Sequence, residues 1–201
     1  MATGPVSAAV TSSRRGRRGP GSGPDAPTPG SAADRTPDAD PEQVARLILL
    51  RRLESAPRTR AELRGDLTAR GVPDDVAERM LDRFTEVGLI DDAAYAEAWV
   101  RSRHAGRGLA RRALAAELHR KGIDRDTAQA ALEAVDADDE RARAVELVRR
   151  RLPSLSRVAP EARARRLVGM LARKGYSPGL AAAVVRQELA ADPLDDHDGW
   201  G

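Results

Sequence analysis

The stretch TRAELRGDLTARGVPDDVAERML, residues 59–81, decides the fold, because its pattern returns twice further along the chain. ARRALAAELHRKGIDRDTAQAAL follows at residues 110–132, and RARRLVGMLARKGYSPGLAAAVV at residues 163–185. The three segments align on Gly71, Gly122 and Gly175, which are 51 and 53 residues apart, and each has leucines four and eight residues before its glycine. A period of about 50 residues indicates an array of repeated structural units.

Each segment predicts two short helices. The leucines lie four residues apart, so they share one face of a helix and can be buried together. Glycine then ends this helix in the left-handed conformation, and the basic residue before it meets the negative end of the helix dipole. A second helix follows after a short turn, with Pro73 or Pro178 near its first turn in two of the copies.

One more helix is predicted ahead of each pair, at roughly residues 41–54, 92–104 and 138–152. The chain is therefore expected to be all-α, with three tandem three-helix repeats. A unit of about 50 residues is marginal alone, so the units should stack into an elongated, curved array. The repeats are expected at residues 41–90, 91–137 and 138–190, with Pro153 ending the first helix of the third. A Pro- and Gly-rich tail expected to be disordered (1–40) and a flexible acidic tail (191–201) flank them.

Composition excludes several kinds of chemistry. There is no cysteine, and the three histidines are far apart in sequence, so neither a metal site nor a cofactor is expected. GRG at residues 106–108 is too short for a phosphate-binding loop and is interpreted as a turn. No apolar run reaches the length of a membrane span. We therefore expect a non-enzymatic, monomeric protein of the cytoplasm.

The basic residues are concentrated in the middle of the chain, where they greatly outnumber acidic ones from Arg101 to Arg125 and again from Arg141 to Lys174. This distribution favours a polyanion or an acidic protein surface as partner, and the competing interpretation is a solvated helical surface. The candidate partner-binding residues are Arg101, Arg103, Arg107, Arg111, Arg112, Arg149, Arg150, Arg165, Arg166 and Lys174.

The most distinctive single stretch is GLIDDAAYAEAWVRSR, residues 88–103. Asp91 and Asp92 precede a predicted helix, where short carboxylates accept backbone N–H bonds, whereas a metal-binding or acid–base pair would need a further ligand. Tyr95 and Trp99 align with aliphatic residues of the first repeat, which favours core packing over the stacking of unpaired bases.

The repeats, the helix endings and the GLIDDAAYA stretch resemble the RecX family of recombination regulators over roughly residues 41–190. The resemblance implies a small regulator that lies in the groove of the RecA–DNA filament and bridges neighbouring RecA subunits. It further implies reduced ATP hydrolysis, strand exchange and co-protease activity, with roles in DNA repair, homologous recombination and the SOS response. Some members of the family also bind single- or double-stranded DNA directly.

Two other functions remain open from the residues alone. A general nucleic-acid-binding helical repeat protein is one, because paired helices with basic surfaces are typical of helix-turn-helix units. The chain has no asparagine, so such binding would depend mainly on phosphate contacts and on salt concentration. A scaffold that binds an acidic protein is the other.

Overall fold

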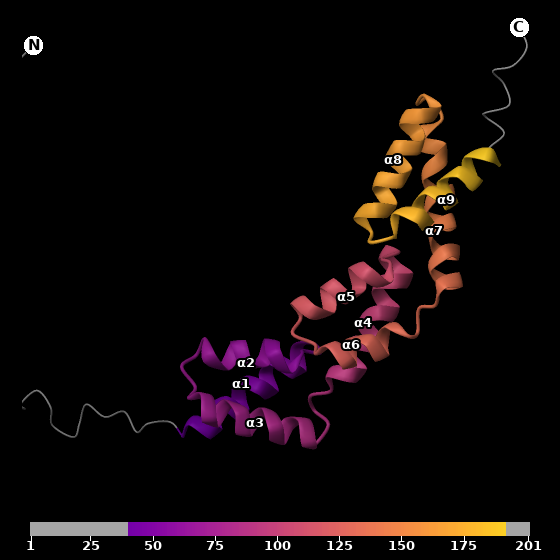
Figure 1. The fold of residues 1–201 in the computed structure, drawn as a ribbon. Helices are drawn as coiled ribbons and strands as arrows, with labels where there is room; N and C mark the ends of the chain where they lie inside the picture. Colours follow the sequence, from indigo (N-terminus) through magenta and orange to yellow (C-terminus); the bar gives the residue numbers. More distant parts are fainter. Residues whose placement is uncertain (1–39, 192–201) are drawn as a thin grey trace, which may run out of the picture. The chain divides into compact units, whose positions relative to one another are not determined.

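The computed structural model describes residues 40–191, which are all-helical (Figure 1). These residues form the helices α1 (Pro41–Ser55), α2 (Arg60–Thr68), α3 (Asp74–Glu86), α4 (Asp92–Arg107), α5 (Arg111–Arg120), α6 (Arg125–Leu132), α7 (Ala137–Arg151), η1 (Leu152–Leu155), α8 (Pro160–Arg173) and α9 (Pro178–Ala190). The expected terminal tails lie outside the described residues, apart from their innermost positions 40 and 191.

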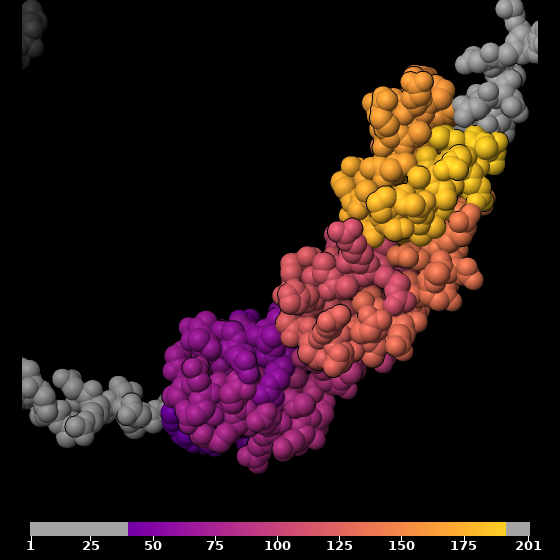
Figure 2. Space-filling view, in the orientation of Figure 1, coloured from indigo at the N-terminus to yellow at the C-terminus, as the bar shows by residue number. Residues whose placement is uncertain are grey.

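The helices pack in three consecutive triplets, α1–α3, α4–α6 and α7–α9, which we call the first, second and third bundles (Figure 1). In the space-filling view the indigo to purple surface is that of the first bundle, whereas the coral surface of the second bundle runs without a break into that of α7 (Figure 2). The leucine pairs identified in the sequence are fully buried in all three. Together with neighbouring apolar side chains they form one core cluster per bundle.

The glycines at the ends of α2, α5 and α8 confirm the predicted left-handed turn. Gly71, Gly122 and Gly175 have φ angles of 72°, 76° and 91°. In each bundle the residue after the glycine donates its backbone N–H to the carbonyl of the second leucine, as Val72 does to Leu67 at 3.2 Å. This hydrogen bond holds the residue after each glycine, which is Val72, Ile123 or Tyr176, in the buried core.

Two local predictions need correction. The GRG segment is not a free turn, because α4 continues through Arg107 and only Gly108 takes the left-handed conformation that ends it. Of the basic residues before the repeat glycines, Arg70 donates to the Asp66 carbonyl at the end of its own helix at 3.0 Å, but the two lysines contact other helices. Lys121 pairs with a carboxylate of the first bundle, and Lys174 donates its ammonium hydrogen to the Arg107 carbonyl at the end of α4.

The third bundle differs from the other two at the start of its second helix. Thr59 and Ala110 are the N-caps of α2 and α5, whereas the aligned residue, Arg163, lies inside α8, whose N-cap is Ala159. At the position where α2 and α5 have a buried cap, α8 has an extra helical turn. In the other two bundles this cap contacts the glycine turn of the next bundle, as described below. The array therefore has a distinct end within the described residues.

Candidate partner-binding surface and the joints behind it

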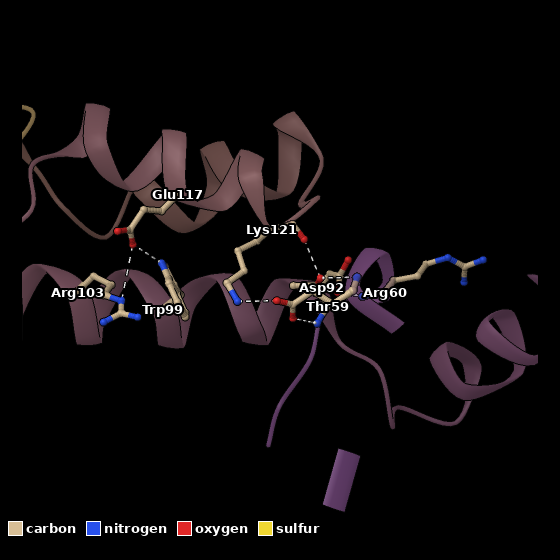
Figure 3. A network of polar contacts seen from close by, with 8 residues as sticks. Thr59, Arg60, Asp92, Trp99, Arg103, Glu117 and Lys121 are labelled. Atoms are coloured by element: carbon tan, nitrogen blue, oxygen red, sulfur yellow. Dashed lines mark hydrogen bonds and ion pairs between the residues drawn. The ribbon is translucent and has the colours of Figure 1, made fainter. Parts of the chain in front are cut away.

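The first and second bundles are joined by polar contacts around the start of α2 (Figure 3). Thr59 is completely buried. Its hydroxyl accepts a hydrogen bond from the Glu62 backbone N–H at 3.2 Å and donates one to the Lys121 carbonyl at 2.7 Å. Lys121 then places its Nζ 2.6 Å from the Glu62 carboxylate. The capping residues of α2 thus also hold the glycine turn of the next bundle.

The pKa of the Glu62 carboxyl shows that the contacts of this joint favour its charged form. Burial alone would raise its pKa, but hydrogen bonds from Lys121 and the Thr59 backbone, together with nearby positive charge, outweigh burial and hold the pKa below its ordinary value. A lowered carboxyl pKa contributes stability above the pKa of the unfolded state, and that contribution is lost as the pH falls through the folded pKa. Acidification should therefore weaken the first joint.

Asp92 contributes to the same joint and is not a second cap of its own helix. Asp91 alone caps α4, by accepting from the Ala94 backbone N–H at 2.8 Å. The Asp92 carboxylate instead accepts from the backbone N–H of Arg60, in the first bundle, at 2.9 Å (Figure 3). Burial raises the Asp92 pKa in spite of that hydrogen bond. A half-buried carboxylate here completes the capping of α2 from a neighbouring bundle.

Asp92→Asn should leave the free energy of unfolding at pH 7 unchanged or raise it by up to about 1 kcal/mol. The amide oxygen still accepts the Arg60 N–H bond, and the cost of burying a charge disappears. Because the folded pKa is raised, that cost is absent at low pH and appears as the pH rises. Urea unfolding at pH 7 and pH 3 checks this, with Asp92→Ala as the control that loses the acceptor. Equal destabilisation by both substitutions would contradict it.

The two aromatic residues of α4 lie beside this joint. Tyr95 and Trp99 stack with ring centroids 5.7 Å apart, and Trp99 donates its indole N–H to Glu117 on α5 at 2.8 Å. The Arg103 guanidinium lies 4.1 Å above the Trp99 ring, and the Lys121 ammonium 4.7 Å from it. Both rings are only half-buried, so the expected core packing is partly right. The fully buried positions of α4 are Ala96 and Val100.

The second and third bundles are joined at the start of α5, just as the first and second are joined at the start of α2. We call these two contacts the second joint and the first joint. The Ala110 backbone N–H donates to the Lys174 carbonyl at 2.9 Å, and the completely buried Ala110 side chain belongs to the core of the third bundle. Tyr176, also buried, donates its hydroxyl hydrogen to the Gly108 carbonyl at 3.2 Å. Burial raises the pKa of Tyr176 to about 12. The second joint therefore depends on a neutral phenol.

Tyr176→Phe should flatten the alkaline loss of stability. With a folded pKa of about 12, the phenol is neutral in both states below about pH 10, and above it the unfolded chain ionises first. Stability then falls by about 1.4 kcal/mol per pH unit until the folded phenol ionises too. The variant loses the hydrogen bond and with it about 1 kcal/mol of unfolding free energy at pH 7. Its stability, however, should not show this decline at alkaline pH. Urea unfolding from pH 8 to 11 measures both, and Tyr95→Phe should keep the slope.

Small residues bring the backbones close at both joints. A Cβ at Gly122 would lie 2.2 Å from the Ala61 Cβ, and a Cβ at Gly175 would lie 2.7 Å from the Ala113 backbone nitrogen. The equivalent Gly71 has nothing within 4 Å. Each joint thus pairs a glycine turn with the first turn of the preceding bundle's second helix.

Several of the candidate basic residues are engaged in contacts that stabilise the fold, most of them within a single bundle. Arg111 donates to the Val135 carbonyl at 2.6 Å, and Arg149 pairs with the buried Glu188 at 2.6 Å. Arg103 and Arg107 lie 3.7 and 3.8 Å from Glu117. Weaker surface pairs join Arg101 to Glu97 at 3.4 Å and Arg150 to Glu146 at 2.9 Å, each within one helix. Lys174 reaches the end of α4, and its pKa is lowered by burial and by nearby arginines.

The remaining candidates are exposed. Arg112, Arg165 and Arg166 make no ion pair with another residue in the range 40–191. The structure therefore divides the candidates into residues committed to the fold and residues available to a partner. Two of these three residues, Arg165 and Arg166, lie on α8 in the third bundle.

Two kinds of site are missing from the described part of the chain. No group of three or more His, Asp or Glu side chains within residues 40–191 is arranged to hold a metal ion. Over the same residues, no helix is both long and hydrophobic enough to cross a membrane. What the described surface offers is helical faces, joints and exposed arginines.

The fold defines a class, namely an array of three-helix bundles. Family models for the first, second and third three-helix domains of RecX match residues 45–84, 91–132 and 138–185. The chain belongs to the RecX family of regulatory proteins.

Two relatives and one solved structure illustrate the match. The protein named Regulatory protein RecX from Thermobifida fusca is 54% identical over 176 residues, which cover 86% of this chain and 91% of the relative. Its namesake from Mycobacterium avium is 52% identical over 158 residues, covering 78% and 91%. The crystal structure of RecX from Lactobacillus salivarius aligns with a TM-score of 0.69 at 23% identity, covering 76% of this chain and 99% of that one. At that identity the likeness shows the fold alone.

Proposed function

We propose that this chain binds the filament that RecA forms on DNA, and reduces its ATP hydrolysis, strand exchange and co-protease activity without catalysing a reaction itself. Membership of a family of regulatory proteins supports a regulatory role. The resemblance in the repeats and in GLIDDAAYA supports RecA as the target. Its place of action is then the cytoplasm, where the filament forms.

The observation that carries the mechanism is the pair of joints between the bundles. Each combines backbone or capping hydrogen bonds with a glycine turn set against a helix start, so neighbouring bundles hold a defined geometry. A protein of this kind can contact two adjacent RecA subunits at once. It would then oppose the relative movement of those subunits that accompanies ATP turnover.

The proposal is tested by ATP hydrolysis of RecA on single-stranded DNA, titrated with this protein, with binding to bare DNA measured in parallel. We expect inhibition at well below one molecule per RecA subunit, because one bound molecule restricts more than one subunit. Unchanged hydrolysis together with tight, salt-sensitive binding to bare DNA would overturn the proposal. It would favour the alternative of a general nucleic-acid-binding repeat protein.

A further inference from the structure

A hollow of about 960 Å³ lies on the third bundle. One wall is a stripe of α8 residues three or four apart, and the other comes from the end of α7 and from η1. Its lining is Arg151, Leu155, Ala162, Arg165, Arg166, Gly169, Met170 and Arg173. Four of these eight residues are arginines and none is acidic, so the hollow gathers positive charge without a carboxylate to balance it.

The arginines of this hollow differ from many others in the array, which are paired with carboxylates. In the first bundle Arg60 pairs with Glu78 and Asp82, both at 2.8 Å. The guanidinium groups of the four hollow arginines, by contrast, form no ion pair or hydrogen bond with any other residue between 40 and 191. Four like charges around one concavity repel one another, and a bound anion would relieve that repulsion.

The lining indicates which anion fits. Guanidinium groups bind phosphate and carboxylate through paired N–H donors. The other lining side chains are apolar or absent, so the hollow has neither the amides that read base edges nor the aromatic anchors common in protein interfaces. From Arg165 to Arg173 the helix rises about 12 Å, the length of roughly three nucleotides in one DNA strand. A repeating phosphate backbone matches this better than a protein surface.

We propose that this arginine hollow is a binding site for the phosphate backbone of DNA. The inference deepens the proposed function and rests on it in one respect, since it gives the third bundle the contact with the filament's DNA. The first two bundles then contact RecA, and several of their arginines, such as Arg60 and Arg103, are committed to ion pairs within the fold. Binding through the hollow is independent of base sequence and strongly dependent on salt.

The test compares two double variants that remove equal charge. R165Q/R166Q alters the hollow, and R46Q/R83Q alters two exposed arginines of the first bundle that have no ion pair within the described range. The probe is a fluorescein-labelled single-stranded DNA, with binding followed by fluorescence anisotropy at several salt concentrations. All four positions are exposed, so the far-ultraviolet circular dichroism of both variants should match that of the unaltered protein.

For R165Q/R166Q we expect a loss of affinity of about tenfold and a slope of log affinity against log salt that is shallower by about 1.4. R46Q/R83Q should retain most of the affinity. Equal losses in the two variants would overturn the inference, because total charge would then explain the binding. An R165Q/R166Q variant that keeps its DNA affinity but binds RecA alone more weakly would also overturn it, since the hollow would face a protein.

The inference and the proposed function fail in different ways. If the unaltered protein does not inhibit RecA but loses DNA binding through R165Q/R166Q, the hollow stands and the RecA role falls. If it inhibits RecA while R165Q/R166Q binds bare DNA normally, the RecA role stands and the hollow falls.

Discussion

Gly175→Ala is expected to lower the free energy of unfolding by roughly 4 kcal/mol. Gly175 has a φ of 91°, so any Cβ is strained there, and this Cβ would lie 2.7 Å from the Ala113 backbone nitrogen. A backbone atom cannot rotate away, so the third bundle must move. Movement loses the hydrogen bond from Ala110 to Lys174 and the one from Tyr176 to Gly108.

Gly71→Ala is the matched control for this substitution. Gly71 occupies the same place in the first bundle with a φ of 72°, and nothing lies within 4 Å of its would-be Cβ. It should lose only the conformational strain, about 1–2 kcal/mol. Urea unfolding of both variants measures the difference. If the two lose equal stability, the close approach at the second joint contributes nothing.

Gly122→Ala tests the first joint, and a second substitution should rescue it. The added Cβ would lie 2.2 Å from the Ala61 Cβ but 3.7 Å from the Ala61 Cα, so the clash is with a side chain. We expect a loss of about 3 kcal/mol for the single variant, from strain and displaced contacts. Ala61→Gly alone should cost about 1 kcal/mol, as glycine does within a helix.

The double variant A61G/G122A separates these contributions. With the Ala61 methyl removed, only the strain at position 122 and the helix cost at position 61 remain, so the two changes should couple favourably by about 2 kcal/mol. The measurement is a double-mutant cycle from urea unfolding. Simple additivity of the two single losses would show that the close approach of Gly122 to Ala61 has no energetic weight in solution. The Gly175 clash, which involves backbone, offers no such rescue.

Much of the fold could be predicted from the sequence because its signals are local. Paired leucines four residues apart, followed by a basic residue and glycine, specify a helix and its end without reference to other parts of the chain. Repetition of that signal at Gly71, Gly122 and Gly175 then indicated the number of units. Boundaries of the helices before these pairs differed from the expected ones by only a few residues.

The joints could not be predicted because their signals are not local. Ala61 and Ala113 resemble any helix alanine in the sequence, and only the folded chain places them against glycines of the next bundle. Asp92 looks like a helix cap, which short carboxylates usually are, yet it accepts from Arg60 across the joint. The signal that was available is the pairing of a small residue in one repeat with a glycine in the next.

The partner-binding residues were predicted only as a group. Sequence position does not reveal which arginines meet a carboxylate elsewhere, as Arg149 meets Glu188, which lies 39 residues further along the chain. The aromatic residues illustrate the same limit. Tyr95 and Trp99 align with residues of α1 that are also half-buried, and in the second bundle this face lies beside the joint. Burial at a repeat position depends on the neighbouring bundle as well as on the period.

The most direct test of the central claim, that joined bundles act as one unit on neighbouring RecA subunits, uses the first joint. RecA ATP hydrolysis on single-stranded DNA would be titrated with the unaltered protein, with G122A and with A61G/G122A. We expect inhibition to weaken markedly for G122A and to return for A61G/G122A, although neither substitution changes a charge. Equal inhibition by all three proteins would contradict it, because the bundles would then act without a fixed geometry between them.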